Sequence, residues 1–201
     1  MFSRSRWAGV AGLFVLLAAG CTNGAAAAPP ARTWHGFASS CPALTAPPYG
    51  VAANGKRITS SVAPGEQATL DKVVPGAALD GVTCEYAVPG QASPLITADI
   101  KVFGGDGGAT QATAWFQSEK SAAGRVGGGV DNADVPGVAD GAFALYFEPE
   151  LHLGARSGNA YVSVVVLPSA EVAQTFDKVQ PLQQQVPALT AVATDVLAGL
   201  T

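Results

Sequence analysis

The sequence predicts an α+β fold with one disulfide, in which helices pack on one face of an antiparallel sheet built from hairpins and a meander. Short runs of alternating apolar and polar residues, separated by proline and glycine turns, are typical of hairpins. The helical patterns follow groups of strands and do not alternate with single strands, so parallel βαβ units are not expected. The glycine-rich segments also lack the spacing of a dinucleotide-binding loop.

The clearest pattern is a hairpin followed by a helix. Residues 82–88 are β-like and end at a Pro-Gly pair, and residues 95–103 alternate between two faces. The apolar face of the second strand carries Ile96, Ala98, Ile100 and Val102. Glycines at 104–108 end that strand, and residues 109–123 are expected to form a helix. One helix face carries Ala112, Trp115, Phe116 and Glu119.

The second half of the chain predicts a meander. A Gly- and Asp-rich loop at 127–141 leads to a strand over residues 143–147, and residues 151–153 continue with another strand. A turn at 157–159 reverses the chain into residues 161–167, whose valines suit a buried strand.

Two helical segments close the pattern. Ser169 is a suitable N-cap for the first, and Pro187 is placed to start the second. The second segment has one apolar stripe, formed by Leu189, Val192, Val196 and Leu200. The region between Cys41 and Cys84, the two cysteines of the domain, is less regular. Pro47 and Pro48 interrupt any helix there, residues 58–62 fit a short strand, and residues 68–74 fit either element.

The N-terminus has the pattern of a lipoprotein signal peptide. Arg4 and Arg6 precede an apolar run at 7–19, and Leu-Ala-Ala-Gly then leads into Cys21. The run is shorter than the 18 to 20 residues that a spanning helix needs. We therefore expect residues 1–20 to be removed and Cys21 to carry diacylglycerol and further acyl chains such as palmitate. This predicts an exported protein, anchored to the outer face of the cell membrane.

The segment after Cys21 is predicted to be a tether. Residues 21–40 contain an alanine and proline run with no hydrophobic period, which is typical of an extended or flexible linker. Trp34, His35 and Phe37 interrupt it, and we interpret them as the start of packing onto the domain; an aromatic contact site for a partner is the alternative. A single α+β domain is expected over residues 41–201.

Charge excludes two classes of partner. Removing Arg4 and Arg6 from the eleven basic side chains leaves nine against fifteen acidic ones, a formal net charge of −6. No basic cluster is present, so binding to nucleic acid or to anionic lipid headgroups is not expected. Attachment to the membrane is therefore assigned to the acyl chains, of which more than one is needed for stable anchoring.

The cysteines predict one disulfide. Lipidation accounts for Cys21 and leaves Cys41 and Cys84 as an even pair in an exported protein. No Cys-x-x-Cys or histidine spacing suggests a metal or redox site. Closing this loop would remove denatured-state entropy equivalent to about 4 kcal/mol.

With these features the chain resembles a group of small actinobacterial lipoproteins built on a domain of unknown function. That group is similar to the extracellular sensor domain of the PknH-type serine/threonine kinases. The matching features are the lipobox cysteine, Ser-Cys-Pro at 40–42, Cys-Glu-Tyr at 84–86, the central helix, the Val-Pro-Gly-Val-Ala-Asp-Gly-Ala-Phe segment at 135–143 and a closing helix. The resemblance implies a cell-surface binding or sensing module, with a disulfide that joins the first segment to the sheet. Pro47 and Pro48 depart from the helix that usually follows the first cysteine.

Catalytic motifs are not found. The two histidines are His35, in the tether, and His152, which alternates with leucines on a strand. No nucleophile elbow or phosphate-binding loop occurs. Calcium binding by the loop carboxylates is an alternative to a role in turns, but their spacing fits turns better than an EF-hand. These are Asp106, Asp131, Asp134 and Asp140.

The sequence therefore predicts a binding or protein-interaction module that is not an enzyme and has no cofactor or metal. The expected partners are a small apolar ligand or an envelope protein, and the candidate groove residues are Trp115, Phe116 and Tyr146. An exported carboxylate-based hydrolase and a structural envelope protein are the alternatives.

Overall fold

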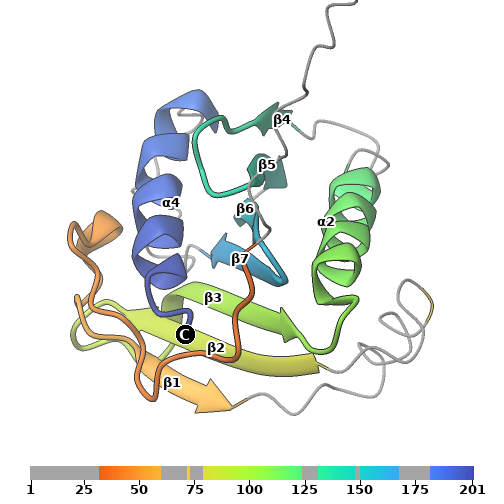
Figure 1. Ribbon diagram of the computed structural model, residues 1–201. Coiled ribbons are helices and arrows are strands. Elements are labelled where there is room, and N and C mark those ends of the chain that lie inside the picture. Colours follow the sequence, from red (N-terminus) through yellow and green to blue (C-terminus); the bar gives the residue numbers. More distant parts are fainter. Residues whose placement is uncertain (1–31, 60–71, 73–78, 124–130, 148–149, 168–181) are drawn as a thin grey trace, which may run out of the picture. The chain divides into compact units, whose positions relative to one another are not determined.

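The computed structural model describes residues 32–59, 72, 79–123, 131–147, 150–167 and 182–201. Within these residues, seven strands form one sheet in the order β1-β2-β3-β7-β6-β5-β4, and every neighbouring pair is antiparallel (Figure 1). The elements are η1 (Pro48–Gly50), β1 (Lys56–Thr59), β2 (Leu79–Ala87), β3 (Pro94–Phe103), α2 (Gly108–Ala123), β4 (Asp131–Asp134), β5 (Gly141–Phe147), β6 (Glu150–Ser157), β7 (Ala160–Val166) and α4 (Leu182–Leu197).

The topology confirms the predicted α+β class and its hairpins. Strands β1, β2 and β3 are consecutive neighbours, and so are β4, β5, β6 and β7. The helix α2 connects these two groups, and β7 closes the sheet by pairing with β3. The prediction of a loop over residues 127–141 missed β4, a strand of four residues at the sheet edge. Its Asp-Asn-Ala-Asp sequence has low β-propensity, so its pairing with β5 depends on the neighbouring strand.

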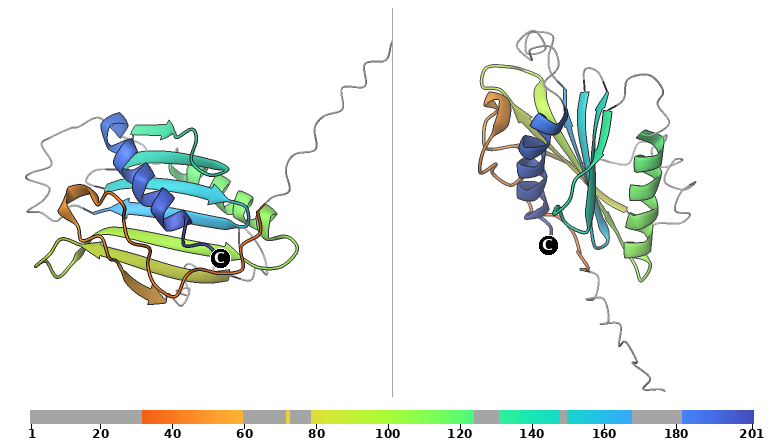
Figure 2. Two further views of the ribbon diagram at one scale, coloured as in Figure 1. Left: turned by 60° about the vertical axis from the view of Figure 1, so that its left-hand side comes forward. Right: turned by 90° about the horizontal axis from the view of Figure 1, so that it is seen from above.

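The helices lie on opposite faces of the sheet, which corrects the prediction that they share one face (Figure 2). Neighbouring residues of a strand point to opposite faces. Phe103, Phe143 and Tyr161 cluster with Ala112, Trp115 and Phe116 of α2. The alternate residues of the same strands, such as Val102, Ala144 and Val162, belong to the cluster that contains α4. We refer to these sides as the α2 face and the α4 face.

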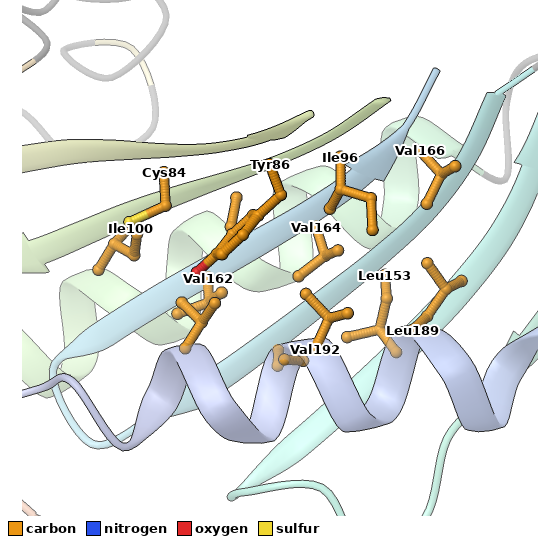
Figure 3. Close-up of a cluster of buried hydrophobic side chains, with 14 of the residues drawn as sticks. Cys84, Tyr86, Ile96, Ile100, Leu153, Val162, Val164, Val166, Leu189 and Val192 are labelled. Atoms are coloured by element: carbon orange, nitrogen blue, oxygen red, sulfur yellow. The ribbon is translucent and has the colours of Figure 1, made fainter. Parts of the chain in front are cut away.

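The larger core lies on the α4 face (Figure 3). The predicted stripe of α4 is confirmed, because Leu189, Val192 and Val196 are buried there against β-branched and leucine side chains of β3, β6 and β7. The sheet side of this core is formed by Ile96, Ala98, Ile100, Leu153, Val162, Val164 and Val166. Pro187 does not start the helix as predicted but lies inside it, since α4 begins at Leu182. The predicted helix at Ser169 lies outside the described residues.

The disulfide between Cys41 and Cys84 is confirmed, with an S–S distance of 2.09 Å. Cys84 is on β2 and points to the α4 face, so the bond holds the segment after Cys41 against that face. The same segment contains η1, a single turn in place of the longer helix that the resemblance implied. Its Tyr49 hydroxyl donates to Gln185 Oε1 of α4 at 2.8 Å. The segment and α4 therefore cover the α4 face together.

Candidate functional site

The three aromatic residues predicted to line a groove do not lie together. Trp115 and Phe116 are only 4% and 6% exposed, because they fill the space between α2 and the sheet. Phe116 packs edge-on to Phe143 with ring centroids 5.3 Å apart. Tyr146 lies three residues after Phe143 on β5, so the two side chains point to opposite faces of the sheet. Tyr146 therefore points to the α4 face, where it packs against the larger core. The α2 aromatics are core residues, and they lie on the opposite face of the sheet from Tyr146.

The polar residues singled out from the sequence mostly have local partners. His152 Nε2 lies 2.7 Å from Glu150 Oε2, at half-buried positions of β6. Asp140 accepts a hydrogen bond from the Gly158 amide at 2.6 Å and lies 3.6 Å from Arg156 Nη1. Asp134 pairs with Lys120 of α2. Asp140 therefore stabilises the turn between β6 and β7, in agreement with the turn interpretation. Asp131 and Asp134 instead lie on strand β4, so the turn interpretation was wrong for these two residues.

A different place in the domain has the geometry of a binding site. A cleft of about 500 Å³ opens at the end of the sheet where β3 finishes and β2 begins. Four segments line it: the chain before Cys41, the start of β2, the end of β3 with the glycine loop that follows, and the turn between β6 and β7. The lining residues are Thr33, Trp34, His35, Asp80, Val102, Gly104, Gly105, Asp106 and Asn159.

The cleft wall before Cys41 belongs to residues 32–38, which we call the strap. The sequence assigned these residues to the tether, but the aromatic residues in it do pack onto the domain, as we interpreted them. Trp34 and Phe37 contact the larger core, and Phe37 forms an isolated antiparallel bridge with Leu200. The amides of His35 and Gly36 donate to the Thr201 backbone oxygen at 2.6 and 3.2 Å. The strap therefore runs as an extended segment beside residues 199–201.

Asn159 connects the strap to the end of β3. Its Oδ1 accepts from the Trp34 amide at 2.6 Å, and its Nδ2 donates to the Trp34 carbonyl oxygen at 2.8 Å. The same Nδ2 donates to the Phe103 carbonyl oxygen at 2.9 Å, and the Phe103 amide donates to the Asn159 backbone oxygen at 2.9 Å. Asn159 is only 5% exposed, so one buried amide sets the distance between two walls of the cleft.

The β6–β7 turn requires glycine next to Asn159. Gly158 has φ +56°, a conformation that favours glycine. A Cβ at this position would lie 1.8 Å from the Arg32 carbonyl oxygen. The missing side chain allows the strap backbone to cross the turn in direct contact with it. The Trp34 indole then reaches Ser157, donating from Nε1 to its backbone oxygen at 3.0 Å.

The titratable side chains of the cleft are two carboxylates and one imidazole. Asp80 of β2 and Asp106 of the glycine loop are both exposed, and His35 is exposed on the strap. No lysine or arginine lies among the lining residues. Asp80 and Val102 are paired across β2 and β3 and point to the α4 face, so the cleft has an apolar floor beside a carboxylate. Such a lining suits hydrogen-bond donors and cationic groups.

Sequence reasoning considered parts of this site separately. The sequence places His35 in the predicted tether. The glycine loop at 104–108 does not fit a phosphate-binding loop, because it contains no lysine. Asn159 was interpreted only as a turn residue. The local signal for it was the Ser-Gly-Asn turn, but its partners Trp34 and Phe103 are 125 and 56 residues away. No pattern in the sequence connects positions at such separations.

Neither the helices nor the acidic side chains of the described part of the chain add another kind of site. No helix described by the structure is long and apolar enough to cross a membrane. Among the described residues, no three His, Cys, Asp or Glu side chains are arranged to hold a metal ion.

Comparisons with protein-family models, curated proteins and solved structures found no match. The disulfide indicates an oxidising, extracytoplasmic compartment.

Proposed function

We propose that this chain is an exported lipoprotein, anchored through Cys21, whose domain binds a small ligand in the cleft beside the strap. The observation that carries this proposal is the cleft, which four segments of the chain line. Asn159 holds two of these walls, the strap and the end of β3, at a fixed distance. Ligand sites of this size combine an apolar surface with a few convergent polar groups. The resemblance to lipoproteins with a sensor-like domain agrees with such a role.

The lining favours a polar ligand over the small apolar one expected from the sequence. Asp80 and Asp106 offer acceptor oxygens, and the backbone of Gly104 and Gly105 carries no side chain that would block a ligand. A protonated amine is a suitable donor to such carboxylates, and no lysine or arginine of the lining competes for them. The proposed ligand is therefore cationic or rich in hydrogen-bond donors.

An exported enzyme is the second candidate, because carboxylates and an imidazole are general acid–base groups. Asp80, Asp106 and His35 are all exposed, however, whereas enzymes commonly exclude water from reacting groups. The proposal of a binding module fits this exposure better. A protein-interaction role for the same surface is a further alternative.

The ligand proposal is tested by native mass spectrometry of the protein purified from membranes of its own host. We expect a co-purifying molecule that is lost from an Asp80→Asn, Asp106→Asn variant. Asp131→Asn, Asp134→Asn is the matched control, because it also removes two carboxylate charges, from β4 at the sheet edge opposite β1. Retention of the molecule by the double variant would place its site elsewhere, and its absence from the wild-type protein would contradict the proposal.

The anchor is tested separately. Mass spectrometry of the mature wild-type protein is expected to show diacylglycerol on Cys21, and the protein is expected in the membrane fraction. Cys21→Ala is expected to be released without acylation. Normal acylation of that variant would contradict the lipobox interpretation while leaving the cleft proposal intact.

A further inference from the structure

The strap is attached to the domain more weakly than the segment that follows it. No residue from 32 to 40 is buried, whereas Cys41 and Leu44 are. The covalent attachment begins at Cys41, through its bond to Cys84. Before that point the strap is held by hydrogen bonds and by the half-buried rings of Trp34 and Phe37. The hydrogen bonds of Trp34 with Asn159 and Ser157 are only half-buried. Segments with few buried apolar contacts open locally at a lower free-energy cost than global unfolding.

The hydrogen bonds that hold the strap can all break together when the strap leaves the domain. The amides of His35, Gly36 and Ala38 donate to the backbone oxygens of Thr201 and Gly199, and the Thr201 amide donates back to the Gly36 carbonyl oxygen. The other hydrogen bonds join Trp34 to Asn159 and Ser157. None of them belongs to the sheet ladder or to the disulfide loop. The strap is thus able to leave without breaking a strand pairing. This organisation is that of a separate opening unit.

We infer that the strap is a releasable wall of the cleft, which detaches as a unit while the disulfide-held domain stays folded. Thr33, Trp34 and His35 leave the cleft lining when it opens, so a ligand that contacts them binds the docked form more tightly than the released form. By linkage, ligand binding then stabilises docking and release lowers affinity by the same factor. The coupling to a ligand rests on the proposed function, whereas release of the strap does not.

Release also changes the length of the membrane tether. With the strap docked, the chain from Cys21 to Arg32 spans eleven residues and reaches at most about 40 Å. With the strap released, the first fixed point is Cys41, twenty residues from Cys21, and the reach becomes about 70 Å. The docked strap therefore shortens the maximum distance between the domain and the anchor. This consequence rests on the proposed anchor at Cys21.

Amide hydrogen exchange on the full mature chain tests the release without a ligand. We expect the amides of Trp34, His35, Gly36 and Ala38 to exchange about 100-fold faster than the paired amides of β3 and β7, with little dependence on added denaturant. Equal rates and equal denaturant dependence for the strap and β7 would overturn the inference, since the strap would then open only by global unfolding.

A matched pair of glycine variants sharpens the test. Gly158→Ala places a Cβ against the Arg32 carbonyl oxygen, and Gly158 does not line the cleft. Gly90→Ala also adds a side chain at a positive φ, +87°, with nothing within 4 Å of the added Cβ. We expect strap exchange to rise about tenfold in Gly158→Ala relative to Gly90→Ala, with equal exchange in β3 and β7. Identical strap exchange in the two variants would contradict the role of this contact, and loss of protection throughout Gly158→Ala would contradict independent opening.

Discussion

The α4 face of the sheet carries a continuous aliphatic layer, whereas the α2 face carries a small aromatic cluster beside polar side chains. On the α4 face, the helix, the disulfide and the segment after Cys41 all cover the sheet. On the α2 face, burial is concentrated beneath the helix. Further along that face Thr83 donates to Asp99 at 2.6 Å, at half-buried positions of β2 and β3. Because more chain covers the sheet on the α4 face, we expect that face to contribute more to stability than the α2 face.

The largest effect is expected from the disulfide on the α4 face. We expect the Cys41→Ala, Cys84→Ala variant to lose about 4 kcal/mol of unfolding free energy, because the loop of sequence separation 43 is no longer closed in the denatured state. Urea unfolding of the mature domain measures this loss, and the reduced wild-type protein is the control. A change below about 1 kcal/mol would show that the α4 face does not depend on its covalent attachment.

The next effect concerns the helix on that face. Leu189 is fully buried against the sheet, so Leu189→Ala is expected to cost about 3 kcal/mol through lost burial and a residual cavity. Thr194→Ala on the exposed side of α4 is the matched control, with an expected change within about 0.5 kcal/mol. Equal urea midpoints for the two variants would contradict the assignment of the main core to this face.

Alkaline pH probes one tyrosine on each face. Burial, followed by the charge of Asp195, raises the pKa of Tyr86 from 10.0 to about 12. Burial, followed by the charge of Glu119, also raises the pKa of Tyr161 on the α2 face. Because the folded pKa is above the unfolded one, the stabilisation is complete below pH 10 and is lost as pH rises toward 12.

We therefore expect urea midpoints to fall from pH 10 upward, together with delayed tyrosinate absorbance. The decrease is expected to be smaller in Tyr86→Phe and in Tyr161→Phe, since each variant removes one of the titrating groups. A wild-type midpoint that stays constant to pH 12 would contradict the burial of both hydroxyls.

The smallest effect is expected on the α2 face. Phe116→Leu keeps an apolar side chain and removes the edge contacts with Phe143 and Tyr161, which we expect to cost about 1 kcal/mol. Gln117→Ala, on the exposed side of α2, is the control. If Phe116→Leu were as destabilising as Leu189→Ala, the two faces would contribute equally and the comparison would fail.

Much of the fold was predictable because strands and helices follow local periodicity. The alternation over residues 95–103 predicted β3, and the stripe from Leu189 to Val196 predicted the buried side of α4. The side occupied by α2 was missed because the other face of β3 carries Thr97, Asp99 and Lys101 and looks solvated. Lys101 instead lies over the Trp115 ring at 5.6 Å, and its neighbour Phe103 is fully buried beneath α2.

A signal for burial on both sides was present in β5. Phe143 and Leu145 alternate with Ala142 and Ala144, so both faces of the strand are apolar. Strands buried on both faces show continuous apolar runs of this kind. Trp115 and Phe116 do not line a groove, because α2 buries both side chains against the sheet. An aromatic stripe on a helix is more often part of a core than of a binding surface.

The sequence by itself determined the antiparallel strands, the apolar stripe of α4 and the pairing of Cys41 with Cys84, since each depends on local periodicity or on a small number of cysteines. Only the tertiary structure decided which face each helix covers and where a cleft forms. Trp34, Phe103 and Asn159 meet there although they are far apart in the chain. Contacts of this kind arise from the packing of whole elements, and no short pattern of residues encodes them.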